Sequence, residues 1–154
     1  MSNNFGHVES MTESVGGKEC NFRSKLEYRW AVWCQFRKEQ GIIDEWWYED
    51  PDSLLELRIG QYNNLRKYLP DFTIQIGEDF EFEETKGYFT PKDASKMRAA
   101  AEQYENPFTL IFANLNNTKS MRAQFNRARR LIPHLKRVIF DAKKTIFNKI
   151  PGIK

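Results

Sequence analysis

The sequence predicts a single α/β domain, and three observations support this fold class. Residues 22–41 contain no internal proline or glycine and stop at a glycine, as expected of a helix of about four turns. Residues 69–86 hold two segments in which apolar and polar side chains alternate, which is the two-residue period of strands. A further helical segment and an apolar strand follow. This mixture in a chain of 154 residues fits one α/β domain with its own core.

The predicted first helix has one buried side, because Leu26, Trp30 and Trp33 recur at helical spacing. The sequence IDEWWYED that follows predicts a short strand, ended by Pro51. Residues 51–67 are ambiguous, since LLELRI fits either a strand or a helical turn and GQYNN resembles a loop.

A hairpin is predicted next, with the sequence GED as the turn between LPDFTIQI and FEFEETK. On its second strand, Phe80 and Phe82 lie on the same face as Glu84 and Lys86. That face should therefore begin with two buried aromatic side chains and end with a carboxylate and an ammonium group. The opposite face, which carries the other two glutamates of the strand, is expected to be solvated.

A second helix is predicted after the hairpin. Thr90, Pro91 and Asp93 supply a capping hydroxyl, a proline at the first helical position and an acid in the first turn. The helix should continue until Asn106 and Pro107 break it, and FTLIFANL then predicts a strand. The predicted order is helix, three strands, helix and strand, followed by a long helical tail.

The carboxylates of the hairpin predict a cation site. A buried lone carboxylate is costly, and Asp71, across the hairpin, would repel Glu84 unless a positive charge lay between them. Mg²⁺ prefers such hard oxygen ligands, and Mn²⁺ can substitute. Lys86 would then position or deprotonate an attacking water and stabilise negative charge at phosphorus. The constellation favours phosphodiester hydrolysis.

These residues also carry a resemblance. Pro70-Asp71, a spacer of twelve residues and Glu84-Thr85-Lys86 resemble the signature of the PD-(D/E)XK nucleases. The segment FRSKLE resembles the helix that bears an additional acid in several members, including phage junction-resolving endonuclease I and transposon-end-cleaving nuclease subunits. The predicted order of elements is similar to that family's restriction-endonuclease-like core.

The resemblance implies an Mg²⁺-dependent DNA endonuclease that is selective for branched or junction DNA, or tolerant of sequence. It implies that Asp71, Glu84 and Glu27 are metal ligands and that Lys86 is the catalytic lysine. Glu27 could instead form a salt bridge to Arg23 one turn earlier. The alternative functions are a catalytically silent DNA-binding or assembly module and a nuclease subunit of a recombination or transposition complex.

The chain is expected to have three parts. Residues 1–20 are expected to be a flexible tail, residues 21–117 the nuclease core, and residues 118–154 a basic amphipathic helical extension. A shift of one residue in the register of the hairpin would make Glu83, in place of Glu84, the metal ligand.

Charge supports a separate role for the C-terminal part. Residues 119–154 hold eleven Lys or Arg and one acid, whereas the preceding residues carry a net charge of −7. Two helices hinged near Ile132 are predicted, with Pro133 opening the second.

Apolar residues at alternating spacings of four and three predict one stripe: Met121, Phe125, Ala128, Ile132, Leu135, Ile139, Ala142 and Ile146. Cations repeating every seven residues form two rows beside it: Arg122, Arg129, Lys136 and Lys143, and Arg130, Arg137 and Lys144.

Two interpretations of each feature remain open. The stripe packs either on the domain's own core or in a homodimer interface. The basic rows either bind a DNA phosphate backbone or form a solvated face.

Composition excludes several other classes. No apolar run is long enough for a membrane span, and the polar N-terminus lacks a signal peptide, so no membrane partner is expected. Cys20 and Cys34 do not make a disulfide framework, which indicates a reducing, cytoplasmic environment. With only His7 and His134 besides, a structural zinc site is not expected.

Overall fold

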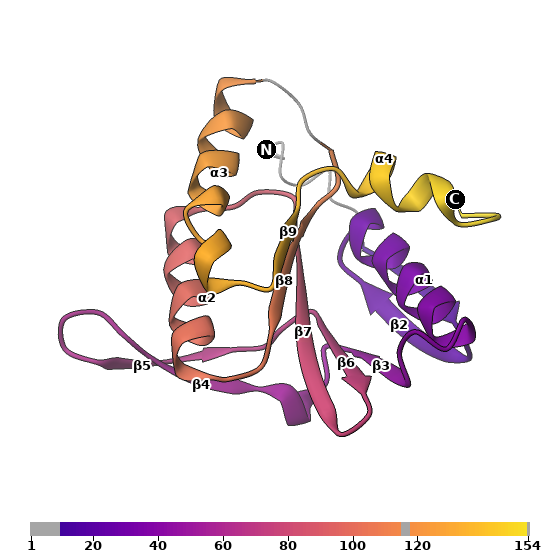
Figure 1. Cartoon of the computed structure of the whole chain (residues 1–154), viewed down its shortest axis with the longest axis horizontal. Helices are drawn as coiled ribbons and strands as arrows, with labels where there is room; N and C mark the ends of the chain where they lie inside the picture. Colours follow the sequence, from indigo (N-terminus) through magenta and orange to yellow (C-terminus); the bar gives the residue numbers. More distant parts are fainter. Residues whose placement is uncertain (1–9, 115–117, 154) are drawn as a thin grey trace.

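The computed structural model describes residues 10–114 and 118–153 and has a mixed α/β fold (Figure 1). The helices and strands, in chain order, are β1 (Met11–Val15), β2 (Lys18–Phe22), α1 (Lys25–Glu39), β3 (Glu45–Tyr48), β4 (Leu55–Ile59), β5 (Asn64–Tyr68), β6 (Phe72–Ile76), β7 (Asp79–Lys86), α2 (Pro91–Gln103), β8 (Phe108–Phe112), α3 (Lys119–Arg129), β9 (Arg137–Ile139) and α4 (Ala142–Thr145). None of the helices in the described part of the chain is both long and apolar enough to cross a membrane.

A five-stranded mixed sheet in the order β3-β6-β7-β8-β9 forms the centre of the fold. β3, β6 and β7 are antiparallel neighbours, and β8 and β9 run parallel to β7. α1, the β1–β2 hairpin and α4 lie on one side of this sheet, while α2 and α3 lie on the other (Figure 1). Because both faces are covered, β8 is buried at all five positions.

Each side of the sheet has its own core. Trp30 of α1 packs with Trp46, Phe72 and Ile74 on one face, and all four side chains are at most 1% exposed. The other core contains the α2 and α3 side chains with the opposite face of β7 and β8: Phe82, Met97, Ala100, Phe108, Leu110, Phe112 and Phe125.

The secondary structure predicted for the middle of the chain is confirmed. The hairpin β6–β7 has the predicted turn, with Gly77 at a φ of 63°. The start of α2 is a complete capping box, in which the Thr90 side chain accepts from the Asp93 N–H and the Asp93 side chain accepts from the Thr90 N–H. The ambiguous residues 51–67 contain the β4–β5 hairpin, inserted between β3 and β6.

The predicted tail of residues 1–20 is wrong for the part that the structure describes, while residues 1–9 lie outside the described residues. Residues 11–22 form the antiparallel β1–β2 hairpin, which packs on α1 through the buried Val15 and Phe22. Gly16 and Gly17 supply the positive φ values, 58° and 82°, that a two-residue hairpin turn requires. This glycine pair was the sequence signal for the hairpin.

The predicted helical extension of residues 118–154 is also wrong in part. α3 ends at Arg129, and β9 takes the place of the second helix as the fifth strand of the sheet. Without β9, the outer edge of β8 would leave its backbone groups unpaired, so pairing decides the conformation here. Pro133 opens only a short 3₁₀ turn, Ile132–His134.

The apolar stripe packs on the protein's own core. Phe125, Ala128 and Leu135 are buried with α2 and β8, whereas Ile139, Ala142 and Ile146 are buried on the α1 side. Ile132 is the exception, since it is 47% exposed. The stripe therefore offers no continuous apolar surface for a homodimer.

Candidate active site

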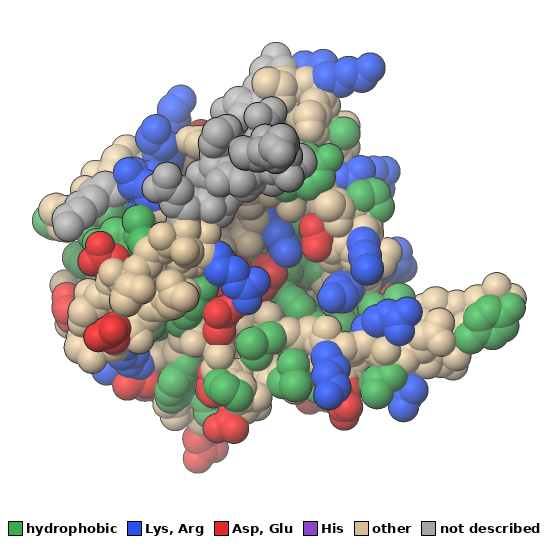
Figure 2. Space-filling view, turned by 180° about the vertical axis from the view of Figure 1, so that it is seen from behind, with side chains coloured by type: hydrophobic (Ala, Val, Ile, Leu, Met, Phe, Trp, Pro, Cys, Tyr) green, Lys and Arg blue, Asp and Glu red, His purple; other side chains and the backbone are tan. Residues whose placement is uncertain are grey.

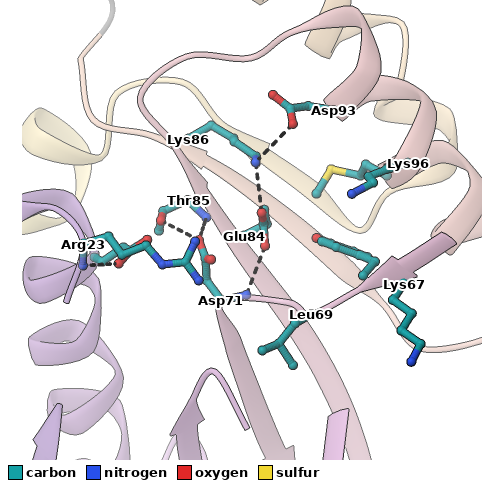
Figure 3. Close-up of a pocket in the computed structure, with 12 residues that line it drawn as sticks. Arg23, Lys67, Leu69, Asp71, Glu84, Thr85, Lys86, Asp93 and Lys96 are labelled. Atoms are coloured by element: carbon teal, nitrogen blue, oxygen red, sulfur yellow. Dashed lines mark hydrogen bonds and ion pairs between the residues drawn. The ribbon is translucent and has the colours of Figure 1, made fainter. Parts of the chain in front are cut away.

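A pocket of about 340 Å³ opens at one end of β6 and β7 and is lined by all four predicted catalytic residues. Asp71 is the residue directly before β6, and Glu84 and Lys86 lie at the C-terminal end of β7; all three side chains line the pocket (Figure 3). Glu27 comes from the first turn of α1, on the far side of Asp71. Three separate elements therefore bring these four side chains together.

Asp71 and Glu84 are buried and directly linked. The last paired residues of the β6–β7 ladder are Phe72 and Glu83, so Asp71 lies just beyond the ladder, beside Glu84. The Asp71 N–H donates to Glu84 Oε1 at 3.0 Å. Asp71 Oδ2 accepts from the Thr85 N–H at 2.9 Å and from the Thr85 hydroxyl at 2.8 Å. Side-chain contacts thus continue the hairpin where the backbone ladder stops.

Asp71 is surrounded by other carboxylates, which disfavour its ionised form. Burial, followed by the charges of Glu84 and Glu27, raises its pKa well above the usual carboxyl value, although the two hydrogen bonds from Thr85 oppose the shift. Burial likewise raises the pKa of Glu84, against the opposing effect of Lys86. A carboxylate pair in this state requires a proton or a cation for stability.

Lys86 provides the positive charge on one side of the pair. Its Nζ lies 3.2 Å from Glu84 Oε2 and 3.5 Å from Asp93 Oδ1 of α2 (Figure 3). Burial tends to lower the pKa of Lys86, but the charges of Glu84, Asp93 and Asp71 outweigh it and the pKa lies above its ordinary value. Lys86 is therefore an ammonium cation here, suited to donating hydrogen bonds and stabilising charge rather than to accepting a proton.

Glu27 lines the pocket and is 7% exposed, but its carboxylate already has partners. Oε1 accepts from the Arg23 backbone N–H at 2.8 Å and from the Tyr48 hydroxyl at 2.5 Å. The guanidinium of Arg23 pairs with Glu49 instead, so the alternative of an Arg23–Glu27 salt bridge is not formed. Glu27 affects the site mainly through its charge on Asp71.

The prediction that Glu83 is solvated is wrong, and so is the alternative that it lines the metal site. Glu83 is 4% exposed and lies on the opposite face of β7, under α1. Its carboxylate accepts from the Arg37 guanidinium at 2.6 and 2.9 Å and from Trp30 Nε1 at 2.8 Å. Phe80, expected to be buried, is 42% exposed because it lies at the start of β7, away from the helices.

The two predicted basic rows are not continuous, because α3 ends at Arg129. The Arg129 guanidinium lies 5.1 Å from the centre of the Phe140 ring, and Lys136 pairs with Glu81 at 2.7 Å. The remaining cations lie on three different elements: Arg122 and Arg130 in or at the end of α3, Arg137 in β9, and Lys143 and Lys144 in α4. The seven residues therefore do not form the two helical rows that the sequence predicts.

Sequence reasoning missed several residues of the pocket. Lys67 and Lys96 lie on one side of the carboxylates and Arg23 lies on the other, so cations flank the acidic centre (Figure 3). The Tyr68 hydroxyl is buried near Glu84 without a hydrogen bond of normal length in the described part of the chain. Burial and the Glu84 charge raise its pKa well above the ordinary value, so it stays protonated. Only its position three residues before Asp71 could have drawn attention to it.

The donor set fits a hard divalent cation with a mostly open coordination shell. Among residues 10–114 and 118–153, no three His, Cys, Asp or Glu side chains converge closely enough to enclose a metal ion. Asp71 and Glu84 would be the protein ligands, which matches the one or two carboxylates typical of Mg²⁺ sites that also use water and phosphate oxygens. The buried, like-charged carboxylates are the observation that favours a cation at this place.

Comparisons with protein-family models, curated proteins and solved structures found no match. The resemblance to PD-(D/E)XK nucleases therefore depends on the motif and on the order of elements in this chain.

Proposed function

We propose that the protein is a metal-dependent DNA endonuclease of the PD-(D/E)XK type. The observation that carries this proposal is the buried Asp71–Glu84 pair, held at the ends of two neighbouring strands with the Lys86 ammonium on Glu84. Mg²⁺, when bound by the two carboxylates, would supply Lewis-acid polarisation of a phosphodiester and a more acidic water. The flanking cations give a polyanionic substrate a favourable approach to an otherwise acidic centre.

The residues of the pocket have separate tasks in this proposal. Asp71 is oriented by Thr85, and Glu84 is oriented by the Asp71 N–H, so both carboxylates are preorganised before substrate arrives. Lys86 donates to the attacking water or to a phosphate oxygen and stabilises the negative charge that develops there. Lys67 and Lys96 hold neighbouring phosphates of the strand.

A silent DNA-binding module is the competing proposal, and the energetics of the pocket argue against it. Asp71 is buried next to two other carboxylates, which costs stability at neutral pH. A purely structural role would be served better by an uncharged side chain. Preference for branched or junction DNA stays an expectation from the resemblance, because no described contact distinguishes DNA structures.

The test is a cleavage assay with linear, nicked, flapped and four-way-junction DNA in Mg²⁺. We expect hydrolysis of at least one substrate by the purified protein alone. Cleavage of every substrate at equal rates would indicate a sequence- and structure-tolerant nuclease. Binding without cleavage of any substrate would favour the silent module or a subunit that acts only within a larger complex.

Metal identity should affect cleavage more strongly than binding. Mg²⁺ and Mn²⁺ suit oxygen ligands in octahedral geometry and should support cleavage, whereas Ca²⁺ should support DNA binding with poor turnover because its shell is larger and less ordered. Gel-shift and cleavage assays on the same DNA would separate the two effects. Full activity in excess chelator would contradict the proposed metal site.

Asp71→Asn should stabilise the metal-free protein at neutral pH. Because the pKa of Asp71 is raised in the folded state, its contribution to stability is complete below the unfolded value and is lost as pH rises through the folded value. Asn has nearly the same shape as Asp but does not ionise, so the variant does not lose this stability as pH rises. Urea unfolding in chelator should show that the variant gains stability relative to the parent as pH increases from 4 upward, roughly the ordinary carboxyl range.

The same two proteins also allow metal binding to be measured without an activity assay. Mg²⁺ should raise the unfolding temperature of the parent and have a much smaller effect on Asp71→Asn. Equal stabilisation of both proteins by Mg²⁺ would place the ion elsewhere.

A further inference from the structure

The β4–β5 hairpin forms an arm that projects from the body beside the pocket. Figure 1 shows the hairpin extending past the lower end of α2, and Figure 2 shows the same arm from behind, standing clear of the remaining surface. Its turn, Gly60–Asn63, closes with a hydrogen bond from the Asn63 N–H to the Gly60 carbonyl at 3.1 Å. Every residue from Gly60 to Lys67 is exposed, so β5 is exposed at four of its five positions.

The base of the arm is fixed to the body. The Arg58 N–H donates to Gln103 Oε1 at 2.8 Å, and Gln103 Nε2 donates to the Arg58 carbonyl at 2.7 Å. The Tyr104 hydroxyl makes the same two-way contact with the backbone of Glu56, at 3.0 and 3.1 Å. Leu57, fully buried, adds an apolar anchor. The arm therefore has a defined direction, which a freely moving loop would lack.

The arm carries three cations, Arg58, Arg66 and Lys67, that have no acidic partner in the described residues. Arg58 and Arg66 donate only to nearby backbone carbonyls, at 3.4 and 2.9 Å. No ion pair joins either of them, or Lys67, to a carboxylate in the described residues. Tyr62 at the tip is 79% exposed, an unusual position for a large aromatic side chain.

The arm is also continuous with the pocket. Lys67 and Tyr68 at the end of β5 line the pocket, and Asp71 follows three residues after Tyr68. A nucleic acid whose phosphate lay beside Asp71 and Glu84 would therefore have its neighbouring segment next to the arm.

We infer that the β4–β5 arm enters the major groove of the duplex segment that flanks the cleaved phosphodiester. This inference rests on the proposed function. A two-stranded β-ribbon fits the major groove, which is about 12 Å wide, and strands of five residues span about 17 Å, enough to reach its floor. Arg58 and Arg66 contact phosphates on the groove walls, while Tyr62 and the polar side chains of the tip contact base edges.

Three variants test the arm. Arg58→Gln with Arg66→Gln removes two cations, Glu56→Gln removes the acid of β4, and Arg98→Gln with Lys149→Gln removes two exposed cations outside the arm and the pocket. In Ca²⁺, the first should weaken duplex binding by about tenfold at physiological salt and make the slope of log affinity against log salt shallower by roughly 1.8, for two lost phosphate contacts. Glu56→Gln should tighten binding, and the third should leave it unchanged.

Entry of the arm into the major groove can be measured separately from DNA affinity. In the parent complex held in Ca²⁺, guanine N7 atoms in the major groove should be protected from methylation over a few base pairs on one side of the cleavage position. Tyr62→Ala should lose this protection and still cleave DNA in Mg²⁺. Circular dichroism and unfolding temperature would show that each variant is folded.

The outcomes separate the two proposals. A parent that binds no DNA would overturn the proposed function and the arm together. A parent that binds and cleaves DNA, with arm variants equal to it in affinity and salt slope, would overturn the arm alone. Unprotected guanine N7 in the parent complex would likewise overturn entry into the major groove, whatever the effect of the two arginines.

Discussion

Asp71→Asn, Glu84→Gln and Lys86→Ala should each reduce metal-dependent DNA cleavage by about 10²-fold or more, while DNA binding is largely kept. The first two replacements are nearly isosteric and weaken the buried Asp71–Glu84 pair that lines the pocket. The third removes the ammonium that lies 3.2 Å from Glu84 Oε2. Single-turnover cleavage with saturating protein would measure the chemical step, and a gel shift in Ca²⁺ would measure binding.

The matched control for these variants is Glu81→Gln. Glu81 belongs to the same strand, but it lies on the α1 face and pairs with Lys136. This variant should cleave DNA at the parent's rate. Robust cleavage by Glu84→Gln would exclude Glu84 as a ligand, and activity in all three pocket variants would refute the nuclease proposal.

Local signals explain which elements could be predicted from the sequence. Helix α2 has its capping residues within four positions, and the β6–β7 hairpin has a glycine turn between alternating segments. β9 has no such signal, because its three residues become a strand only through pairing with β8. Its apolar residues also fit a helical period, and tertiary pairing overrode that period.

The residues of the pocket likewise divide into those with a local sequence signal and those placed by tertiary packing. Asp71, Glu84 and Lys86 could be predicted because the parity of one strand and a short motif place them together. Lys96 and Tyr68 could not, since α2 and β5 reach the pocket through tertiary packing. The sequence predicted parity correctly for Glu83, but the burial of that face depends on α1 and on Arg37, 46 residues away along the chain.

Breaking the Arg37–Glu83 pair should have the largest effect on stability. The two side chains are only 9% and 6% exposed, and Glu83 also accepts from Trp30, so the pair lies inside the core between α1 and the sheet. Arg37→Met would leave an unpaired buried carboxylate, and Glu83→Gln would leave an unpaired buried guanidinium. Each should lower the free energy of unfolding by about 3–5 kcal/mol, measured by urea denaturation.

A double variant distinguishes the cost of an unpaired charge from the value of the pair itself. Arg37→Met with Glu83→Leu removes both charges and fills the site with apolar groups, so it should recover most of the stability lost in either single variant. Glu81→Gln breaks the Lys136–Glu81 pair on the same strand, whose lysine is 51% exposed, and should cost less than about 1 kcal/mol. A double variant no more stable than the single ones would show that the hydrogen bonds from Arg37 and Trp30 to Glu83, rather than charge balance, hold α1 on the sheet.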